Sequence, residues 1–554
     1  MRGRIPGIVL VAVVFLHVAY YGPRVVDDMF ISLRYASSFA HGAGAVFNPG
    51  ERVEGYSSPA WMVFQALGLF LHAEPVLFTK ALGVAALLAL AFGVRELCRS
   101  FGVSTWHAWL PSFAIATSSY VVSWSVLGLE TPLHLALIVL APLAVERAMA
   151  SRTRSSLVVA AAVLVLMGLT RPEALAYVGI NLGAPLLWRA PRGRVIALVA
   201  ATTSPLALFF LARHAYYGDW LANTYYVKGA SAGFDLIKLR ALVGEGTPPS
   251  EAAFHLGGIV LLAGAAVRTR RIAPFASAAF ALYFTASVAV DWMPNLRHLL
   301  PALVLAPVGW AWGIARVDTL VPGRWQRPAA FVALALFAVT CAQLVTVDHR
   351  LSPIEHHRSW VTRKSGAKLA DVLLAYRRVE PPHIAAMGTY EMGQISQCWP
   401  ILETSAEEIS SSWYAGRDIG AVGFYTGVRV FDVAGLVTRE VSRSRAWTHE
   451  NRVEAALVDA MFAHRPVSAD IFDGWDTGAA ARPDLLEHYR IAVGSPKHPH
   501  RIVATDRTAP THDEVLARYR AMAAKLPQAF HVQTLYGETA GAAVERRLRI
   551  VAAE

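Results

Sequence analysis

The sequence predicts a polytopic α-helical membrane protein that ends in a soluble domain of mixed α/β structure. Of its 554 residues, 55% are hydrophobic and only 16% are charged, which is far from the balance of a soluble globular protein. Long apolar runs fill residues 1–347, whereas charged residues, His and Pro separate short mixed segments from 348 to 554. We therefore expect a transmembrane domain over 1–347 and a soluble domain over 348–554.

Eleven apolar runs in the first domain are long enough to cross about 30 Å of hydrocarbon as helices. They occupy residues 5–21, 75–94, 106–123, 131–146, 155–170, 173–188, 195–212, 252–267, 272–290, 298–315 and 328–346. Arg residues gather at alternate connections, for example at Arg95 and Arg99 and at Arg268, Arg270 and Arg271. The positive-inside rule predicts a multi-pass plasma-membrane protein with a cytoplasmic N-terminus and an extracytoplasmic soluble domain. The net charge of +11 then needs no nucleic-acid partner.

The first extracytoplasmic loop is predicted over residues 22–74 and includes a short apolar segment, Pro59–Ala73. This segment is short for a span, and counting it as one would place every later Arg-rich connection outside. We therefore predict an interfacial helix there. The first apolar run has no convincing small-x-small cleavage site, so we expect an uncleaved membrane anchor.

The soluble domain is predicted to contain short buried strands that Gly residues interrupt. These strands are expected at His383–Thr389, Asp418–Gly427 and Val428–Val437. Helical periodicity is present at Asn451–His464 and at Asp513–Leu526. The mixture indicates a small α/β domain.

Two adjacent carboxylates, Asp27 and Asp28, follow the first apolar run. They open a segment in which Ile31, Tyr35 and Phe39 recur every fourth residue, which is typical of an amphipathic helix at a membrane interface. One acid in the first turn would suit the helix dipole as an N-cap. Two acids near membrane depth favour a functional site, because desolvation raises the pKa of a carboxyl group and makes it a better base.

A cation lies on the same predicted helical face as the first acid. Arg34 follows Asp27 by seven residues, so a base and a phosphate-binding cation could share one cleft. Two adjacent carboxylates are also a minimal oxygen site for a divalent metal, but the ligand count is too low to predict one. Further along the loop, NPGE fits a type II turn with Gly50 at its third position.

The stretch DDMFISLRYASSFAHGAGAVFNPGERVEGYSSPAW, from Asp27 to Trp61, resembles the first extracytoplasmic loop of a family of GT-C glycosyltransferases that includes the mycobacterial terminal arabinofuranosyltransferases. The segment GRDIGAVGFYTGVRVFDVAGLV also looks like part of this family. The resemblance implies a catalytic carboxylate at Asp27, as general base, with Asp28 beside it. It implies a donor sugar on a polyprenyl phosphate, arabinofuranose among the candidates, and a cell-envelope glycan as acceptor. Inversion and retention of the anomeric configuration both stay open.

Such chemistry needs cations where the spans end on the outer side, because preorganised charge stabilises a phosphate leaving group. The residues predicted to bind the donor phosphate are Arg34, Arg171, Lys228, Arg297 and His298. Carboxylates, amides and aromatic faces bind sugars, and the predicted sugar- or acceptor-binding residues are Glu51, Glu54, Tyr56, Trp61, Glu130, Glu173, Asn223, Tyr226 and Asp291. The alternative interpretation is structural: Arg171 and Glu173 would pair with each other, and Arg297 would snorkel.

The alternative function is a polytopic transporter or lipid-sugar flippase. Against it, the acids and cations gather at the outer ends of spans and not at the midplane, and the sequence has no evident internal repeat. HExxH, P-loop, GxSxG and dinucleotide motifs do not occur, so protease, ATPase and serine-hydrolase functions have no local support.

Overall fold

The structure of the protein is a computed structural model. It describes residues 5–21, 25–151, 153–187, 190–229, 233–236, 249–288, 297–317, 323–325, 411–416, 418–444, 455–470, 489–493 and 500–504. The predicted span at 328–346, the domain boundary at 347, the strand at 383–389 and the helix at 513–526 lie outside these residues.

The chain forms two compact units. The helical unit comprises residues 1–22, 80–211 and 232–380, and the mixed unit comprises 23–79, 212–231 and 381–554. The first loop therefore groups with C-terminal residues.

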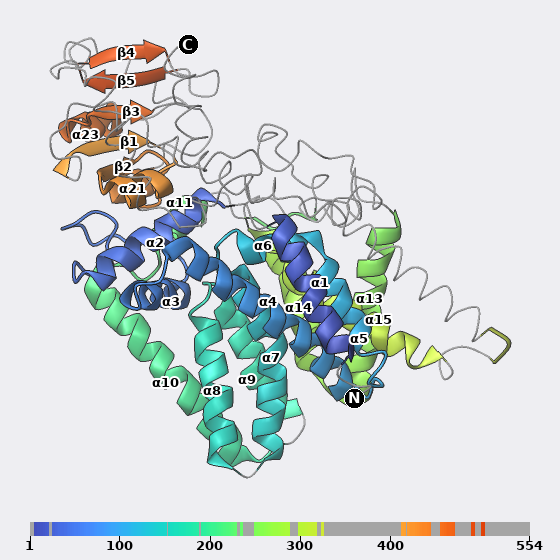
Figure 1. Cartoon of the computed structure of the whole chain (residues 1–554). Helices are drawn as coiled ribbons and strands as arrows, with labels where there is room; N and C mark the ends of the chain where they lie inside the picture. The colour runs from blue at the N-terminus through green and yellow to red at the C-terminus, as the bar shows by residue number, and fades with distance from the viewer. Residues whose placement is uncertain are drawn as a thin grey trace. The chain divides into compact units, whose positions relative to one another are not determined.

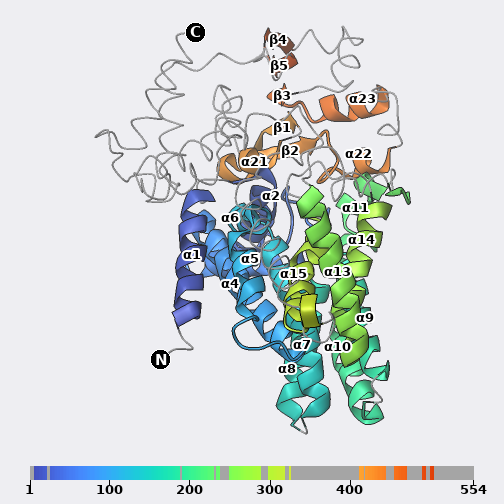
Figure 2. The ribbon, with the colours of Figure 1, turned by 90° about the vertical axis from the view of Figure 1, so that its right-hand side faces the viewer.

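The helical unit is built from packed apolar helices (Figure 1). Its helices are α1 (Ile5–Tyr21), α5 (Trp109–Thr117), α6 (Ser119–Val126), α7 (Thr131–Ala150), α8 (Arg154–Gly168), α9 (Ala174–Leu187), α13 (Pro249–Thr269), α14 (Ile272–Ser287) and α15 (Leu300–Ile314). Most residues of α4 (Pro75–Ser100) and α10 (Arg192–Tyr217) also belong to it. Helices α13 and α15 lie side by side (Figure 2). A Cβ on Gly309 would lie 1.9 Å from the carbonyl oxygen of Gly258, so glycine permits this close approach.

Among the described residues, three helices are long and apolar enough to cross a membrane: α4, α7 and α10. The other predicted spans that are described correspond to shorter apolar helices, and the count of eleven spans stays a prediction. The single helix predicted at 106–123 is wrong, because Ser118 has an extended conformation between α5 and α6. The sequence there is Thr-Ser-Ser, and the Thr117 hydroxyl donates to the Phe113 carbonyl at 2.8 Å. Such side-chain hydrogen bonds compete with regular helix continuation.

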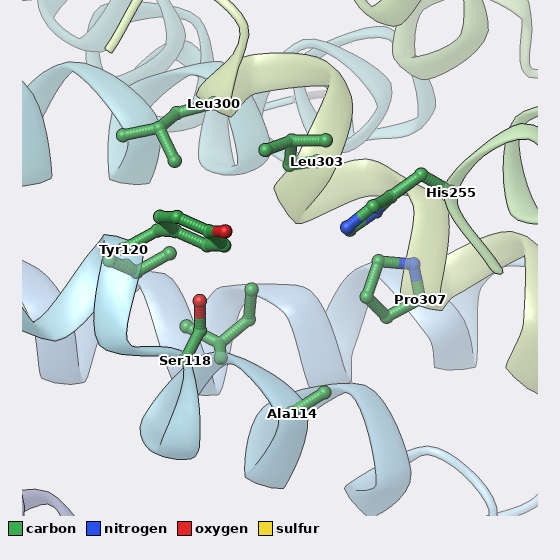
Figure 3. Close-up of a pocket in the computed structure, with 9 residues that line it drawn as sticks. Ala114, Ser118, Tyr120, His255, Leu300, Leu303 and Pro307 are labelled. Carbon is green, nitrogen blue, oxygen red and sulfur yellow. The ribbon is translucent and has the colours of Figure 1, made fainter. Parts of the chain in front are cut away.

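A small hollow lies within the helical unit (Figure 3). Its described lining residues are mostly apolar and come from α5, α6, α13 and α15 or their connections: Ala114, Ile115, Ser118, Tyr120, Val121, His255, Leu300, Leu303 and Pro307. None of these is a predicted site residue.

The mixed unit contains helices and one sheet. Its helices are α2 (Asp27–Ala40), α3 (Pro59–Phe70), α11 (Asn223–Gly229), α21 (Gly420–Thr426), α22 (Arg439–Arg443) and α23 (Ala455–Ala463). Its strands are β1 (Trp413–Gly416), β2 (Arg429–Asp432), β3 (Ser468–Asp470), β4 (Tyr489–Val493) and β5 (His500–Ala504), in the order β2-β1-β3-β5-β4. Strand β1 is parallel to β2 and β3, whereas β5 is antiparallel to β3 and β4. A mixed α/β arrangement is therefore present in the described residues.

The prediction of a strand over Asp418–Gly427 is wrong, because most of this segment forms α21. A short apolar run cannot be assigned to strand or helix from periodicity alone. Here Gly427, with a φ of 74°, ends the helix as its C-cap. The helices predicted from Asp27, over Pro59–Ala73 and over Asn451–His464 are confirmed as α2, α3 and α23, of which α3 ends at Phe70 and α23 is described over Ala455–Ala463.

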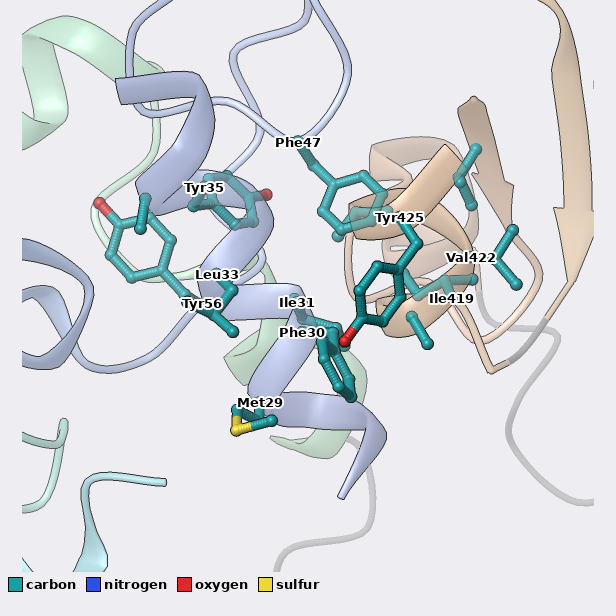
Figure 4. Packing of buried hydrophobic residues seen from close by; sticks show 14 of the residues in the cluster. Met29, Phe30, Ile31, Leu33, Tyr35, Phe47, Tyr56, Ile419, Val422 and Tyr425 are labelled. Carbon is teal, nitrogen blue, oxygen red and sulfur yellow. The ribbon is translucent and has the colours of Figure 1, made fainter. Parts of the chain in front are cut away.

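Helix α2 packs against α21 within the core of the mixed unit (Figure 4). Ile31 and Tyr35 are buried in this core, whereas Phe39 is 44% exposed. The position of this helix at a membrane interface stays a prediction. The other buried apolar residues of α2 are Met29, Phe30, Leu33 and Ala36. A helix with this much buried surface is held by packing.

Candidate active site

The carboxylate of Asp27 is held by the first residues of α21. Asp27 is the first residue of α2 and is only 9% exposed. Its Oδ2 accepts a hydrogen bond from the backbone N–H of Gly420 at 2.7 Å, and its Oδ1 accepts one from Ala421 at 2.8 Å. A Cβ on Gly420 would lie 2.0 Å from the carbonyl oxygen of Asp27, so only glycine fits there. The predicted base is thus fixed in orientation.

The environment of Asp27 raises its pKa to about 8. Burial is the largest cause, and the negative charge of Asp418 adds to it. The amide hydrogen bonds from Ala421 and Gly420 lower the pKa, and Asp28 raises it slightly. A carboxyl group with a pKa near neutrality holds a proton more strongly than an ordinary aspartate, which suits a general base.

Arg34 holds the other end of α21. Its Nε donates to the Phe47 carbonyl at 3.1 Å and its Nη2 to the Gly427 carbonyl at 3.0 Å. The predicted common face of Asp27 and Arg34 is therefore confirmed, but it faces α21. These contacts give Arg34 a structural role that the sequence analysis did not anticipate.

The loop between α2 and α3 is fixed by Asn48, which the sequence analysis missed. Its side chain donates to the Val430 carbonyl at 2.8 Å and accepts from the Val430 N–H at 2.9 Å, so it binds β2 like a strand residue. The predicted turn is confirmed, because the Glu51 N–H donates to the Asn48 carbonyl at 3.1 Å and Gly50 has a φ of 88°. The Glu51 carboxylate faces Arg429 at 3.4 Å.

Three further predicted sugar ligands of the loop are buried. Trp61 is 2% exposed, and the Tyr56 hydroxyl lies 3.1 Å from that of Tyr217. Glu54 forms a buried ion pair with Arg213, with 2.5 Å between Oε2 and Nε. Burial raises the pKa of Glu54 to about 7, although Arg213 lowers it.

Asn223 joins this loop to the region before α22. Its N–H donates to the Glu54 carbonyl at 2.8 Å, and its side chain donates to the Gly435 carbonyl at 2.8 Å. The ring of Tyr226 lies 3.3 Å from the guanidinium carbon of Arg443. Both predicted sugar ligands thus have protein partners.

Glu54→Ala is expected to lower the free energy of unfolding by about 3–5 kcal/mol, because it leaves Arg213 buried without its carboxylate. Glu51→Ala in the same loop is the matched control, because its partner Arg429 is one-third exposed and such pairs contribute about 0–1 kcal/mol. Thermal unfolding of the two variants in detergent compares them. Equal losses would contradict a structural role of the Glu54–Arg213 pair.

Four predicted residues from three connections meet within the helical unit. Arg171 Nη1 lies 2.7 Å from Oε1 of Glu130, and Arg171 Nε pairs with Glu173. His298 Nδ1 lies 3.9 Å from Glu173 and 3.5 Å from Arg171 Nη2. The pairing of Arg171 with Glu173 that the structural alternative predicts is confirmed. The result is a buried cation whose orientation two carboxylates fix.

Three of the four remaining predicted site residues lie in a described helix or shortly before one. Lys228 belongs to α11, Arg297 precedes α15, and Asp291 lies outside the described residues. Asp28 follows Asp27 in the first turn of α2. Within the described part of the chain, no group of three or more His, Cys, Asp or Glu residues is arranged to hold a metal.

Parts of this chain are similar in sequence to known proteins. Residues 385–524 match the family described as "Domain of unknown function (DUF8728)". The terminal beta-(1->2)-arabinofuranosyltransferase of Corynebacterium glutamicum is 29% identical over 229 residues, which cover 37% of this chain and 33% of that protein. The chain therefore matches about a third of the length of this relative.

Solved structures match over nearly the whole chain. ArnT of Cupriavidus metallidurans, bound to undecaprenyl phosphate, superposes with a TM-score of 0.54 at 15% identity, over 91% of this chain and 99% of ArnT. The chain therefore shares the fold of ArnT. The oligosaccharyltransferase of Archaeoglobus fulgidus superposes with a TM-score of 0.52 at 11% identity, over 92% of this chain and 75% of that protein. The resemblance expected from Asp27–Trp61 is confirmed at the level of the GT-C fold.

Proposed function

We propose that this protein is a membrane glycosyltransferase that moves a sugar from a polyprenyl-phosphate donor to a cell-envelope glycan. The observation that carries the proposal is the buried Asp27 carboxylate, which two backbone amides orient and whose pKa is about 8. The GT-C fold, the similarity to a terminal arabinofuranosyltransferase and the undecaprenyl phosphate bound to ArnT support it. The relatives named above do not favour a transporter or lipid-sugar flippase.

Asp27 would act as general base in a single transfer. An acceptor hydroxyl oxygen forms a bond to the anomeric carbon, the bond from that carbon to the phosphate oxygen breaks, and Asp27 takes the hydroxyl proton. The polyprenyl phosphate leaves with the bonding electrons and needs no strong acid. Each carboxylate oxygen of Asp27 accepts one amide hydrogen bond and has a second lone pair, so the acceptor hydroxyl can donate to it.

Arg171 of the helical unit is the cation that we propose for the donor phosphate, with Arg297 and His298 of the same unit and Lys228 of the mixed unit as further candidates. Glu130 and Glu173 hold its guanidinium in place, so little reorganisation is needed when phosphate charge develops. Arg34 is left out of this set, because its hydrogen bonds hold α21. The donor sugar we propose to test first is arabinofuranose.

The proposed function includes the membrane topology predicted from the sequence. The enzyme would be a multi-pass plasma-membrane protein with a cytoplasmic N-terminus, and the part after residue 347 would be extracytoplasmic and contribute to acceptor binding. A divalent metal at Asp27 and Asp28 would need further ligands.

Sugar transfer by purified protein in detergent tests the proposal. Synthetic polyprenyl-phosphate sugars, including the arabinofuranosyl donor, are offered with a native cell-envelope glycan, and product is measured by mass spectrometry. Transfer from at least one donor is expected. Folded protein that transfers from no donor, but moves a lipid-linked sugar across a vesicle bilayer, would establish the flippase alternative.

The pH dependence of sugar transfer is expected to follow the ionisation of the Asp27 carboxyl group. The base must be deprotonated, so kcat/KM should rise with pH through a limb centred near the pKa of about 8. Asp418→Asn removes a negative charge that raises this pKa, so the limb should move to lower pH. Asp459→Asn, at an exposed position on α23, is the control and should leave the limb in place. A limb that moves to higher pH in Asp418→Asn would contradict this assignment.

A further inference from the structure

A group of arginine and tyrosine side chains at the C-terminal end of α10 is not used by the proposed reaction. We call it the arginine patch and define it by Arg52, Tyr216, Asp219, Tyr226, Arg439 and Arg443. Helices α11 and α22, which carry part of it, lie side by side (Figure 2). All of its residues belong to the mixed unit.

Backbone and carboxylate contacts join the patch into one cluster. The Arg439 guanidinium donates to the backbone carbonyls of Arg52 at 3.2 Å and Tyr217 at 2.8 Å. Arg439 also pairs with Asp219 at 2.9 Å, and Arg443 pairs with Asp219 at 2.6 Å. Arg439 is therefore linked to the backbone of Arg52 and, through Asp219, to the side chain of Arg443.

The patch carries excess positive charge that solvent can reach. The side chains of Arg439 and Arg443 are 43% and 33% exposed, and Arg52 is also exposed. Asp219 pairs with Arg439 and Arg443, and Glu440 is an exposed acid of the same short helix α22. Three arginines against these two acids leave an excess positive charge, which attracts a negatively charged partner.

The guanidinium groups are already fixed in position. Arg52 lies over the ring of Tyr216, with 4.8 Å from its guanidinium carbon to the ring centroid, and Arg443 lies 3.3 Å over Tyr226. A planar guanidinium that an aromatic ring holds loses little further freedom when it binds the oxygens of a phosphate. Arginine also matches phosphate with paired N–H groups. The chemistry therefore favours a phosphate.

The position of the patch indicates a lipid phosphate. Helix α10 is long and apolar enough to cross a membrane, and 22% of its most apolar window is buried, against 50% in α4 and 61% in α7. Just beyond its end, Trp220 is 58% exposed and Tyr225 is 52% exposed. An apolar helix that ends beside exposed aromatic rings, with arginines bound to the segment that follows it, is typical of a membrane boundary.

We propose that the arginine patch binds the phosphate groups of anionic phospholipids in the leaflet at the C-terminal end of α10. This site is separate from the proposed catalytic site at Asp27, and it does not depend on the proposed reaction. It would hold the segment between α10 and α11 at the depth of the lipid headgroups. The occupant that we propose is bulk phospholipid, because the exposed guanidinium groups bind the segment that directly follows a helix apolar enough to cross a membrane.

Native mass spectrometry of the full chain tests the proposal, with phosphatidylglycerol and phosphatidylcholine of equal chain length as probes. The wild type should retain phosphatidylglycerol preferentially. Arg439→Gln/Arg443→Gln should weaken this retention about tenfold or more, because each arginine near an anionic lipid surface adds its own contribution to the binding free energy. Arg429→Gln/Arg465→Gln removes the same charge from β2 and from the end of α23 and should retain phosphatidylglycerol like the wild type.

A second variant distinguishes a loss of lipid binding from misfolding of the protein. Arg439 also binds two backbone carbonyls, whereas Arg52 contributes a stacked guanidinium, so Arg52→Gln should weaken retention severalfold and leave thermal unfolding unchanged. Equal retention of phosphatidylglycerol by the wild type, the double variant and Arg52→Gln would overturn the proposal. Displacement of phosphatidylglycerol by an equimolar amount of polyprenyl phosphate would also overturn it, because the patch would then belong to the donor site.

Discussion

Asp27→Asn is expected to lower kcat for sugar transfer by about 10²–10⁴-fold, the range that general bases contribute. An amide cannot take the proton of the acceptor hydroxyl at neutral pH. It also has one oxygen for two backbone donors, so the N–H of Gly420 or of Ala421 would face an amide NH₂ group. Initial rates with saturating donor and acceptor measure the effect.

Asp28→Asn is the matched control for this prediction. Asp28 is the neighbouring acid in the same helical turn, and its charge is the smallest of the named influences on the pKa of Asp27. Its variant should therefore lose less than tenfold in kcat. Both variants must remain folded at the assay temperature and bind the donor, which thermal unfolding and donor titration check. Loss of transfer in Asp28→Asn with retention in Asp27→Asn would move the base to Asp28.

Local features of the loop could be predicted because their signals lie in neighbouring residues. Apolar spacing predicted α2, and Pro59 begins α3 at a position that favours proline. The turn at Asn48–Glu51 follows from proline and glycine at fixed positions. Each of these elements depends on side chains within a few residues, so the sequence contains the whole signal.

The partners of the site residues could not be predicted in the same way. Asp27 is held by backbone amides 393 and 394 residues away, and every residue except proline has such an amide. The sequence therefore contained no side-chain signal for this contact. Glu54 was predicted as a sugar ligand, but its partner Arg213 lies 159 residues away. A glutamate in an apolar loop gives the same sequence pattern whether its side chain binds a ligand or pairs with a buried arginine.

The wrong assignment of α21 follows from the same limit. Its seven residues are apolar or small, and a run of this length fits a buried strand as well as a helix. Packing against α2 and the contacts of Asp27 and Arg34 at its two ends decide between them. Tertiary contacts thus overrode local propensity at the segment closest to the proposed base.

Gly420→Ala is expected to lower kcat by about 10²-fold, because a displacement of about 1 Å at a catalytic group has this effect. The new Cβ would lie 2.0 Å from the Asp27 carbonyl oxygen and 2.9 Å from Oδ2, so α21 and the start of α2 must separate. Separation weakens the two amide hydrogen bonds that lower the pKa of Asp27, but it also admits water and moves Asp418 away, and burial and Asp418 are the larger causes that raise this pKa. The acid limb of kcat/KM should therefore move to lower pH, as it does in Asp418→Asn.

Gly179→Ala in α9 is the matched control, because a Cβ there meets no atom within 4 Å. Alanine should even favour the helix by up to about 1 kcal/mol. A loss of stability in Gly420→Ala without a shifted pH limb would mean that α21 only supports the fold. A lower kcat together with the shifted limb would make Gly420 a positioning residue, through which the C-terminal part of the chain controls the base at its N-terminal loop.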